Sequence, residues 1–338
     1  MVKLYKMLFF IMMISGTLIA ISSYSWFSAW MGLEINLLSF IVLMKNNKNK
    51  FPSESALKYF ITQALGSSLF LFSIVLFLSM KNSLNMELGI TELFFMSTAL
   101  LLKMGAAPFH FWYPEVMSGL SWSNALMLLT IQKIGPLFLL SYNIKSYTFF
   151  FSFIIILSSI IGGLQGLNQI CLRKIMAYSS MNHMGWMIAS LINSTSICIY
   201  YFTIYSIITL SIVLILKKFN IFYLTQFSNI LNQNKKFKFI FMMNFLSLGG
   251  LPPFLGFLPK WLAINCMVEN NHYILAILLI IFSLISLYVY LRISISTFTI
   301  YSSEVLIISF NEVNLLQSIF SSLSLFGLIF CSMIYYLY

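Results

Sequence analysis

Residues 100–112 read LLLKMGAAPFHFW, and they place a lysine inside an apolar run. Lys103 stands five residues before Pro108 and seven before His110. The residues from Thr91 onwards are mostly apolar, so a membrane-crossing helix of about 20 residues is expected around the lysine. An ionised side chain costs about 2.5–3.5 kcal/mol at the centre of such a helix, and residues placed there tend to be functional.

The composition of the whole chain points to lipid as the solvent. Of its 338 residues, 60% are hydrophobic and only 8% are charged, whereas about 25% of the residues of a soluble domain are charged. The sequence therefore predicts an all-α polytopic membrane protein, with residues 1–338 forming a single transmembrane domain. About eleven stretches have the length and apolarity of a membrane-crossing helix, and they lie near 5–23, 25–44, 57–79, 91–113, 121–142, 147–168, 175–193, 196–216, 237–258, 272–296 and 318–337.

The basic residues between these helices predict the orientation of the chain. If the N-terminus is on side one, fourteen of the 19 basic residues fall on that side. They are Lys3, Lys6, Lys45, Lys48, Lys50, Lys58, Arg173, Lys174, Lys217, Lys218, Lys235, Lys236, Lys238 and Arg292. Side two carries only Lys81 and Lys145. By the positive-inside rule, side one is the cytoplasmic or matrix side, and the C-terminus lies opposite.

Several classes of site are not supported by the sequence. The net charge of +11 comes from scattered basic residues, not from one basic face that would bind nucleic acid. The four cysteines are far apart and form no C-x-x-C pair, so neither a zinc site nor an iron–sulfur cluster is indicated. No dinucleotide-binding or phosphate-binding glycine loop occurs. We expect this chain to bind no metal, nucleotide or flavin.

Four ionisable residues lie within or beside the predicted helices. Lys103 and Lys133 are near the middle of theirs, as is Glu34 in WMGLEINLLSF, and Lys260 follows an interrupted helix. A lysine near a helix end can reach water along its own side chain, but the central positions leave no short route to either surface. These four residues are therefore the candidate proton-translocation site.

Two of the predicted helices contain helix-breaking residues close to a lysine. Gly105 and Pro108 follow Lys103, and Pro252 and Pro253 precede Lys260. Broken helices beside a charge are typical of ion paths in transporters with inverted repeats. The two breaks fall in the fourth and ninth helices, which point in opposite directions. We therefore predict two five-helix inverted repeats, at about 1–142 and 147–296, and an extra helix at about 318–337.

Burial makes proton transfer between these groups energetically feasible. Loss of water disfavours the charged form of a lysine, and a nearby carboxylate restores it. At about 4 Å and an effective dielectric near 20, the attraction is about 4 kcal/mol. Moving one proton across about 100 mV needs about 2.3 kcal/mol. Movement of Glu34 relative to Lys103 would thus suffice to gate a relay that continues through Lys133 and Lys260.

Two histidines are secondary candidates for the same relay. His110 follows the first break and His183 lies within a predicted helix, in SSMNHMGW. Histidine titrates near neutral pH and suits a proton shuttle, but a hydrogen-bonded packing role explains each position equally well. The glutamates other than Glu34 lie at helix ends or in loops, where most are expected to be solvated.

Four stretches of the sequence together resemble those of one known family. LLLKMGAAPFHFWYPEV, with its K-x-G-x-x-P-x-H-x-W-x-P pattern, resembles the lysine helix of the antiporter-like proton-translocating family, which includes membrane-arm subunits of NADH:ubiquinone oxidoreductase (respiratory complex I). GGLPPFLGFLPKW is similar to the family's second broken helix and WMGLEINLLSF to its gating-glutamate helix, while SSMNHMGWM is another familiar stretch. The resemblance covers nearly the whole chain and is looser in 200–236 and after 297. Eleven helices, instead of the family's usual fourteen, resemble a mitochondrial member.

The resemblance implies a core subunit of the proton-pumping membrane arm of a proton-translocating NADH:ubiquinone reductase. The gating glutamate would be Glu34, the broken-helix lysine Lys103, the central lysine Lys133 and the exit-side residue Lys260. FMN, iron–sulfur clusters and ubiquinone would belong to other subunits. The implied partners are antiporter-like and small core subunits, accessory subunits and lipids such as cardiolipin. The implied location is the mitochondrial inner membrane, with the N-terminus in the matrix and the C-terminus in the intermembrane space.

Two other functions are compatible with these residues. A stand-alone monovalent cation/proton antiporter would use the same buried charges but would transport ions without partners. A structural or assembly subunit would use the charges only to hold helices together. Proton pumping after replacement of Lys103 distinguishes the structural role from the pump.

Overall fold

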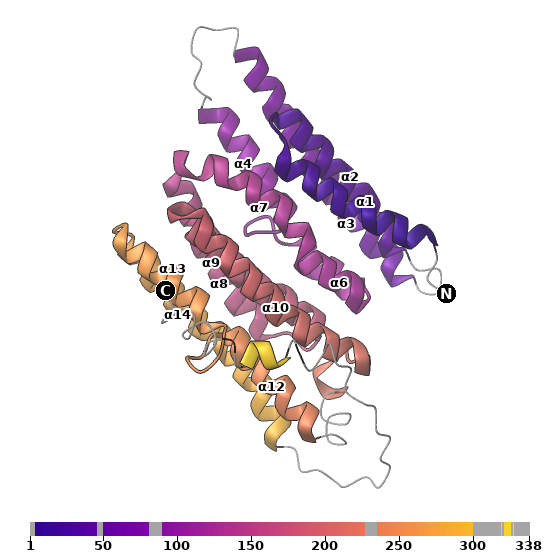
Figure 1. Ribbon diagram of the computed structural model, residues 1–338, viewed down its shortest axis with the longest axis vertical. Helices are drawn as coiled ribbons and strands as arrows, with labels where there is room; N and C mark the ends of the chain where they lie inside the picture. Colours follow the sequence, from indigo (N-terminus) through magenta and orange to yellow (C-terminus); the bar gives the residue numbers. More distant parts are fainter. Residues whose placement is uncertain are drawn as a thin grey trace. The chain divides into compact units, whose positions relative to one another are not determined.

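The computed structural model describes residues 4–45, 50–80, 90–226 and 235–299, together with residues 319, 321–325 and 327. Apart from one isolated bridge between Cys171 and Tyr223, the regular structure of these described ranges is helical (Figure 1). The helices are α1 (Leu4–Ser22), α2 (Trp26–Met44), α3 (Phe51–Met80), α4 (Ile90–Met104), α5 (Trp112–Gly119), α6 (Trp122–Leu129), α7 (Ile131–Asn143), η1 (Ile144–Ser146), α8 (Thr148–Leu167), α9 (Leu172–Asn193), α10 (Thr195–Phe219), α12 (Lys235–Gly249), α13 (Phe257–Glu269) and α14 (Tyr273–Thr299). The all-α prediction is confirmed for these ranges.

Three of the predicted membrane-crossing stretches are each divided into two helices. The stretch 91–113 contains α4, a break and the start of α5, and the stretch 121–142 contains α6 and α7. The stretch 237–258 contains α12, and after a break α13 continues to Glu269, well beyond the predicted end. Pro259 falls in the first turn of α13, where a missing backbone N–H is tolerated. Pro259 therefore stands at the beginning of α13.

Seven helices of the described ranges are long and apolar enough to cross a membrane. One of the seven, Trp122–Ser146, runs through α6, α7 and η1 as a single span. The separate helices α4, α5, α12 and α13 are too short to count, and α9 carries Ser, Asn and His side chains among its apolar residues. The predicted helix at 318–337 lies mostly outside the described residues. The total of eleven helices therefore stays a prediction.

The chain divides into two compact units, residues 1–151 and residues 152–338. In the first unit, α1 packs closely on α2, as Figure 1 shows. A Cβ atom on Gly32 would lie only 2.6 Å from the backbone nitrogen of Ala20, so the two helix backbones are in direct contact. Small residues at helix interfaces allow such contact in membrane proteins. This packing fixes α2, the helix that carries Glu34.

In the second unit, α9 forms the core and is buried over most of its length. It packs against α10, α13 and α14. Asn182 on α9 donates a hydrogen bond from Nδ2 to Ser286 Oγ on α14, at 2.8 Å. Polar side chains that hydrogen-bond across helices help to hold the helices of membrane proteins together.

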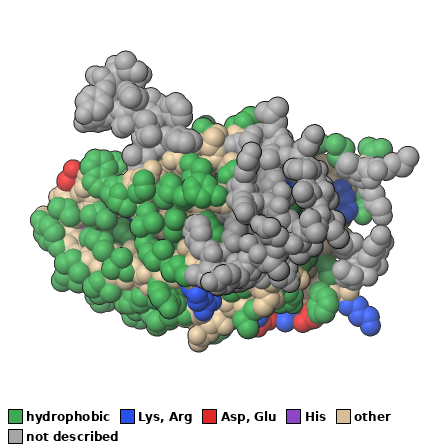
Figure 2. All heavy atoms as spheres, turned by 90° about the horizontal axis from the view of Figure 1, so that it is seen from below, with side chains coloured by type: hydrophobic (Ala, Val, Ile, Leu, Met, Phe, Trp, Pro, Cys, Tyr) green, Lys and Arg blue, Asp and Glu red, His purple; other side chains and the backbone are tan. Residues whose placement is uncertain are grey.

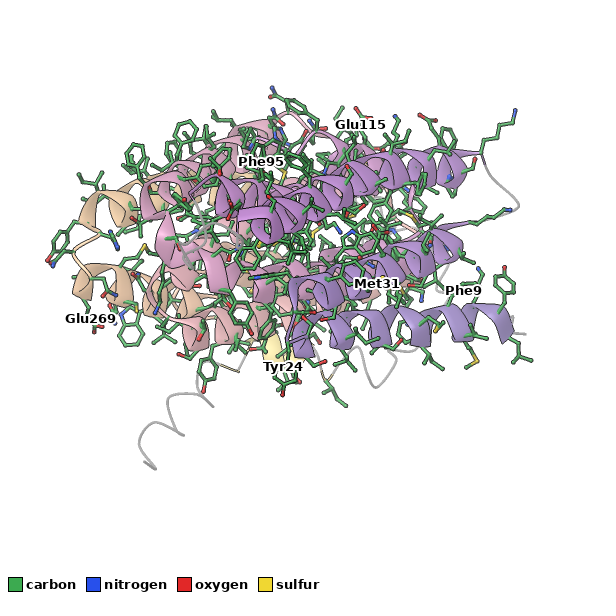
Figure 3. All side chains as sticks on the ribbon, turned by 90° about the horizontal axis from the view of Figure 1, so that it is seen from above. Phe9, Tyr24, Met31, Phe95, Glu115 and Glu269 are labelled. Carbon is green, nitrogen blue, oxygen red and sulfur yellow. The ribbon has the colours of Figure 1, made fainter. Side chains whose placement is uncertain are left out.

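The outer surfaces of the units are apolar. Figure 2 shows hydrophobic side chains over most of the coloured part of one face, with few charged groups among them. Large apolar side chains such as Leu8, Ile11 and Ile274 are more than half exposed, which suits contact with lipid tails. The charged residues Glu115 and Glu269 lie at the surface in Figure 3. Glu115 pairs with Lys58 at 2.8 Å.

Candidate functional site

The break that follows Lys103 is a helix C-cap built on glycine. Gly105 has φ = +73°, a conformation that glycine adopts without the steric penalty of a Cβ atom. Its N–H donates to Leu102 O at 3.1 Å, and the N–H of Ala106 donates to Leu101 O at 3.1 Å. This pair of bonds is the Schellman motif. Lys103 is therefore held in the last turn of α4, where the helix dipole favours a cation.

The side chain of Lys103 is enclosed. Only 6% of it is exposed, and its Nζ has no hydrogen-bond partner among the described residues. Its backbone carbonyl accepts a hydrogen bond from Nε2 of Gln63 on α3, at 3.2 Å. The backbone is thus fixed by a neighbouring helix, whereas the amine has no ligand in the part of the chain that the structure describes. An amine in this situation is free to take part in proton transfer.

Glu34 interacts electrostatically with Lys103 and with Tyr59 on α3. The described residues contain no ion pair within 4.0 Å between Glu34 and Lys103. Glu34 is half-buried, not enclosed. The structure therefore places Glu34 close enough to Lys103 for an electrostatic interaction, but without an ion pair. A shift of α2 or α4 would change the strength of this interaction.

Lys133 lies beside an additional interruption, between α6 and α7, that was not predicted from the sequence. Thr130 separates α6 from α7, and Pro136 stands inside α7. A proline ring crowds the carbonyl four residues earlier, here that of Gln132, and removes one helical hydrogen bond. The dipeptide Gly135–Pro136 was the available signal. Lys133 is 1% exposed.

Tyr113 links the surroundings of the two lysines in the first unit. The Nζ of Lys133 lies 5.5 Å from the centroid of the Tyr113 ring, within cation–π range. A Cβ atom on Gly105 would lie 3.1 Å from the Cβ of the same tyrosine. Tyr113 is therefore packed between the break that follows Lys103 and the amine of Lys133.

A polar chain that sequence reasoning also missed connects three helices beside these lysines. Tyr59 on α3 donates from its hydroxyl to Gln132 Oε1 on α7 at 3.1 Å. Gln132 Nε2 donates to Asn36 Oδ1 on α2 at 2.8 Å. Gln132 precedes Lys133, and Asn36 follows Glu34 by two residues. The chain therefore couples the helix of the acid to the helix of the central lysine.

The second unit repeats the local structure of the first break. Gly250 has φ = +80°, and the N–H groups of Gly250 and Leu251 donate to Ser247 O and Leu246 O. This is again a Schellman motif, at the end of α12. Lys260, at the start of α13, is 6% exposed and donates from Nζ to Gly249 O at 2.7 Å. The lysine thus binds the negative end of the half-helix.

Both histidines are buried and hydrogen-bonded. His110 Nδ1 lies 3.1 Å from Pro108 O within the break. His183 Nδ1 lies 2.9 Å from the Tyr201 hydroxyl, and it lines a cavity of about 10 Å³ together with Pro259 at the second break. That volume approaches the space needed by a single water molecule. A shuttle role for either histidine stays a prediction.

Glu92 is an exception to the expectation that most glutamates outside the site are solvated. It lies in the first turn of α4, but only 2% of it is exposed. Tertiary packing covers this helix end, a feature that the position of the residue in the sequence did not reveal.

In the described ranges, no group of three or more His, Cys, Asp or Glu residues is arranged to hold a metal ion. The expected lack of a metal stays a prediction.

Comparisons with known proteins agree on one family. The profile of the transmembrane family described as NADH:quinone oxidoreductase/Mrp antiporter matches residues 23–286. A protein of Anopheles gambiae named NADH-ubiquinone oxidoreductase chain 2 is 49% identical over 341 residues, which cover 99% of each chain. The protein of the same name from Aedes aegypti is 50% identical over 340 residues, again 99% of each chain.

Solved structures share the fold. A chain of respiratory complex I from Thermus thermophilus with bound aureothin superposes with a TM-score of 0.84 at 24% identity, over 96% of this chain and 79% of that one. A chain of the Mrp complex from Dietzia sp. superposes with a TM-score of 0.77 at 17% identity, over 84% of this chain and 59% of that one. On the family profile and these relatives together, the protein belongs to the NADH:quinone oxidoreductase/Mrp antiporter transmembrane family.

Proposed function

We propose that this chain is the chain 2 subunit of the membrane arm of respiratory complex I and that it translocates protons. Its nearly full-length similarity to relatives of that name supports the assignment. Electron transfer from NADH to ubiquinone in other subunits would drive the transport. FMN, iron–sulfur clusters and ubiquinone would be bound there, and this chain would contribute no redox centre.

One observation carries the proposal: the amine of Lys103 is enclosed but has no hydrogen-bond partner among the described residues. Three helices bring Glu34, Lys103 and Lys133 into the first unit. An approach of the Glu34 carboxylate would favour the protonated amine, and its withdrawal would favour release of the proton. Tyr113 and water molecules near it would then bridge towards Lys133.

Lys260 would be a further proton-binding residue, at the break between α12 and α13. The same Schellman motif at the ends of α4 and α12 supports the two predicted five-helix inverted repeats. The distribution of basic residues between the helices favours an orientation with the N-terminus in the matrix and the C-terminus in the intermembrane space of mitochondria. Partners would include other membrane-arm subunits, accessory subunits and lipids such as cardiolipin.

The proposal is tested by Lys103→Met in the assembled complex, in sealed vesicles, with proton uptake and NADH oxidation recorded together. Methionine keeps the length and apolar packing of the side chain but carries no proton. We expect normal assembly and a fall in proton pumping of at least half. The control is Lys145→Met, because Lys145 is an exposed lysine outside the site.

Two outcomes would favour the other functions. Normal pumping with normal assembly in Lys103→Met would leave the buried charges with a structural role only. Cation/proton exchange by the purified chain in liposomes would favour a stand-alone antiporter, whereas a pump module should show none in the absence of the electron-transfer subunits.

A further inference from the structure

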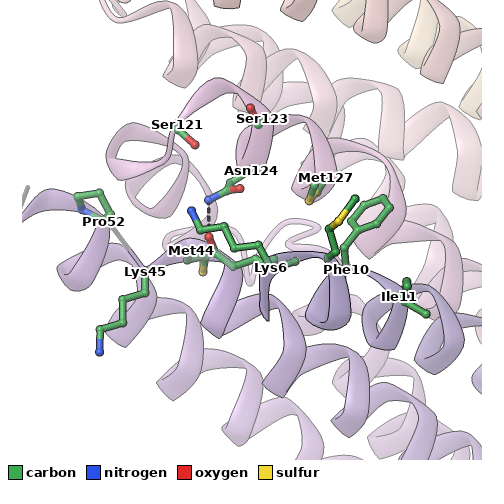
Figure 4. Close-up of a pocket in the computed structure, with 12 residues that line it drawn as sticks. Lys6, Phe10, Ile11, Met44, Lys45, Pro52, Ser121, Ser123, Asn124 and Met127 are labelled. Carbon is green, nitrogen blue, oxygen red and sulfur yellow. Dashed lines mark hydrogen bonds between the residues drawn. The ribbon is translucent and has the colours of Figure 1, made fainter. Parts of the chain in front are cut away.

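A cavity in the first unit lies away from the buried lysines, at one end of the helices. Its volume is about 520 Å³, and ligand sites typically have volumes of about 300–1,000 Å³. The ends of α1, α2, α3 and α6 form it, so it lies where these helices meet the predicted side one. Residues of all four segments are labelled in Figure 4.

The lining has two chemically different parts. The polar part consists of Lys6, Lys45, Ser121, Ser123 and Asn124. The apolar part consists mainly of Met7, Phe10, Ile11, Leu43, Met44 and Met127. Both ionisable residues among the described lining residues are lysines, and none is acidic. The cavity therefore combines a positive mouth with a hydrophobic wall.

The polar part offers positive charge to an anion. Lys6 extends towards Asn124 in Figure 4, and Lys45 extends outward at the rim. Asn124 is held in place because its Nδ2 donates to Leu43 O at 3.0 Å. Ser121, the N-cap of α6, makes no side-chain capping hydrogen bond. The positive end of the α6 dipole therefore adds to the charge of the lysines.

The apolar part opens towards the surroundings of the helix bundle. Met7 and Ile11 on α1 are 57% and 65% exposed, so this wall continues onto the outer, lipid-facing side of α1. A soluble phosphate would make no use of such a wall. A molecule with an anionic head and a hydrocarbon tail would use both parts.

We infer that this cavity is a binding site for an anionic phospholipid, whose phosphate contacts Lys6 and Lys45 and whose acyl chain lies against Met7, Phe10 and Ile11. Basic pockets between transmembrane helices on the matrix or cytoplasmic side bind acidic lipid head groups in general. The inference rests on the proposed orientation, which puts this face on the matrix side. It adds a located site to the lipid partners proposed above.

The test uses the full-length chain in phosphatidylcholine nanodiscs, with a diazirine in the acyl chain of either a phosphatidylglycerol or a phosphatidylcholine probe. Cross-linked peptides are identified by mass spectrometry. We expect the anionic probe to label the α1 and α6 peptides of the cavity at least fivefold more than the choline probe. The attraction between one lysine and an anionic lipid surface is worth about 1 kcal/mol, which corresponds to a difference of about fivefold in binding.

Variants separate the role of the head group from that of the wall. Lys6→Gln with Lys45→Gln should reduce anionic labelling to the choline level, and the double arginine variant should retain it. The control, Lys217→Gln with Lys218→Gln, removes two basic residues of α10 outside the cavity and should label normally. Helicity by circular dichroism confirms that each variant is folded.

Three results would overturn the inference. They are equal labelling by both probes, unchanged labelling in a folded double glutamine variant, and displacement of the anionic probe by inorganic phosphate alone. None of these readouts depends on proton pumping, so a failure of the lipid site is distinguishable from a failure of the proposed function.

Discussion

Replacement of Gln132 by leucine should loosen the coupling between α2 and α7 without removing a charge. Gln132 donates to Asn36 at 2.8 Å and accepts from Tyr59 at 3.1 Å. An interhelical hydrogen bond in a membrane protein is worth about 0.6 kcal/mol on average, and the stranded partners add a desolvation penalty. The loss of both bonds should therefore reduce the local opening free energy by about 1–2 kcal/mol.

Hydrogen–deuterium exchange measures that change directly. A loss of 1.4 kcal/mol is about tenfold in an opening equilibrium, so amides of α2 and α7 should exchange about 5–30-fold faster in Gln132→Leu. Peptides of the second unit should exchange at the wild-type rate. The control is Gln165→Leu, because Gln165 is exposed on α8.

The same variant has a functional consequence in the assembled complex. If the polar chain positions Lys133 relative to Glu34, proton pumping should fall while assembly is preserved. Unchanged exchange in α2 and α7 would refute the structural reasoning. Faster exchange with normal pumping would show that the chain holds helices together without serving proton transfer.

Gly32→Leu should separate α1 from α2, because even a Cβ atom would lie 2.6 Å from Ala20 N; overpacking of this kind costs about 1–3 kcal/mol, and blue-native electrophoresis should show reduced assembly. Lys260→Met removes the 2.7 Å bond to Gly249 O, worth about 1.5–3 kcal/mol for a charged donor, so pumping should fall and α12 should exchange faster near its C-terminus. Glu34→Gln keeps the shape of the half-buried side chain and removes its charge, so assembly should be normal and pumping should fall by at least half.

Matched substitutions make these results specific. Gly166→Ala adds a methyl group in ordinary contact, since a Cβ atom there would lie 3.6 Å from Tyr178 Cβ, and assembly should be normal. Lys260→Arg keeps a donor near the end of α12 and should retain more of its protection than Lys260→Met. Glu115→Gln changes an exposed glutamate outside the site and should pump normally. Loss of assembly in Gly166→Ala as well as in Gly32→Leu would contradict the inference that close packing at Gly32 is responsible.

The sequence predicted those features that local chemistry dictates. Gly105 and Pro108 indicated a break beside Lys103, and the break follows from the backbone conformation that glycine allows at that position. The apolar stretch around Lys103 likewise predicted its burial. Both inferences needed only neighbouring residues.

The features that the sequence did not reveal depend on distant partners. The hydrogen bonds of Gln132 connect residues 73 and 96 positions apart, and no local pattern specifies such pairs. Glu92 is covered by tertiary packing although it stands at a helix end. The extent of α13 was missed for another reason. Pro259 directly follows the predicted stretch 237–258, and a proline is compatible both with the end of one helix and with the first turn of the next.

The decisive measurement for the proposed proton path is a structure of the assembled complex at a resolution that shows ordered water. We expect a continuous file of water molecules from Glu34 past the amine of Lys103 to Lys133, with water also beside Lys260. The Lys103 amine should bind at least one of these molecules, because it lacks a protein ligand in the described ranges. A Lys103 side chain that points into lipid tails, without water and remote from Glu34, would rule out this path.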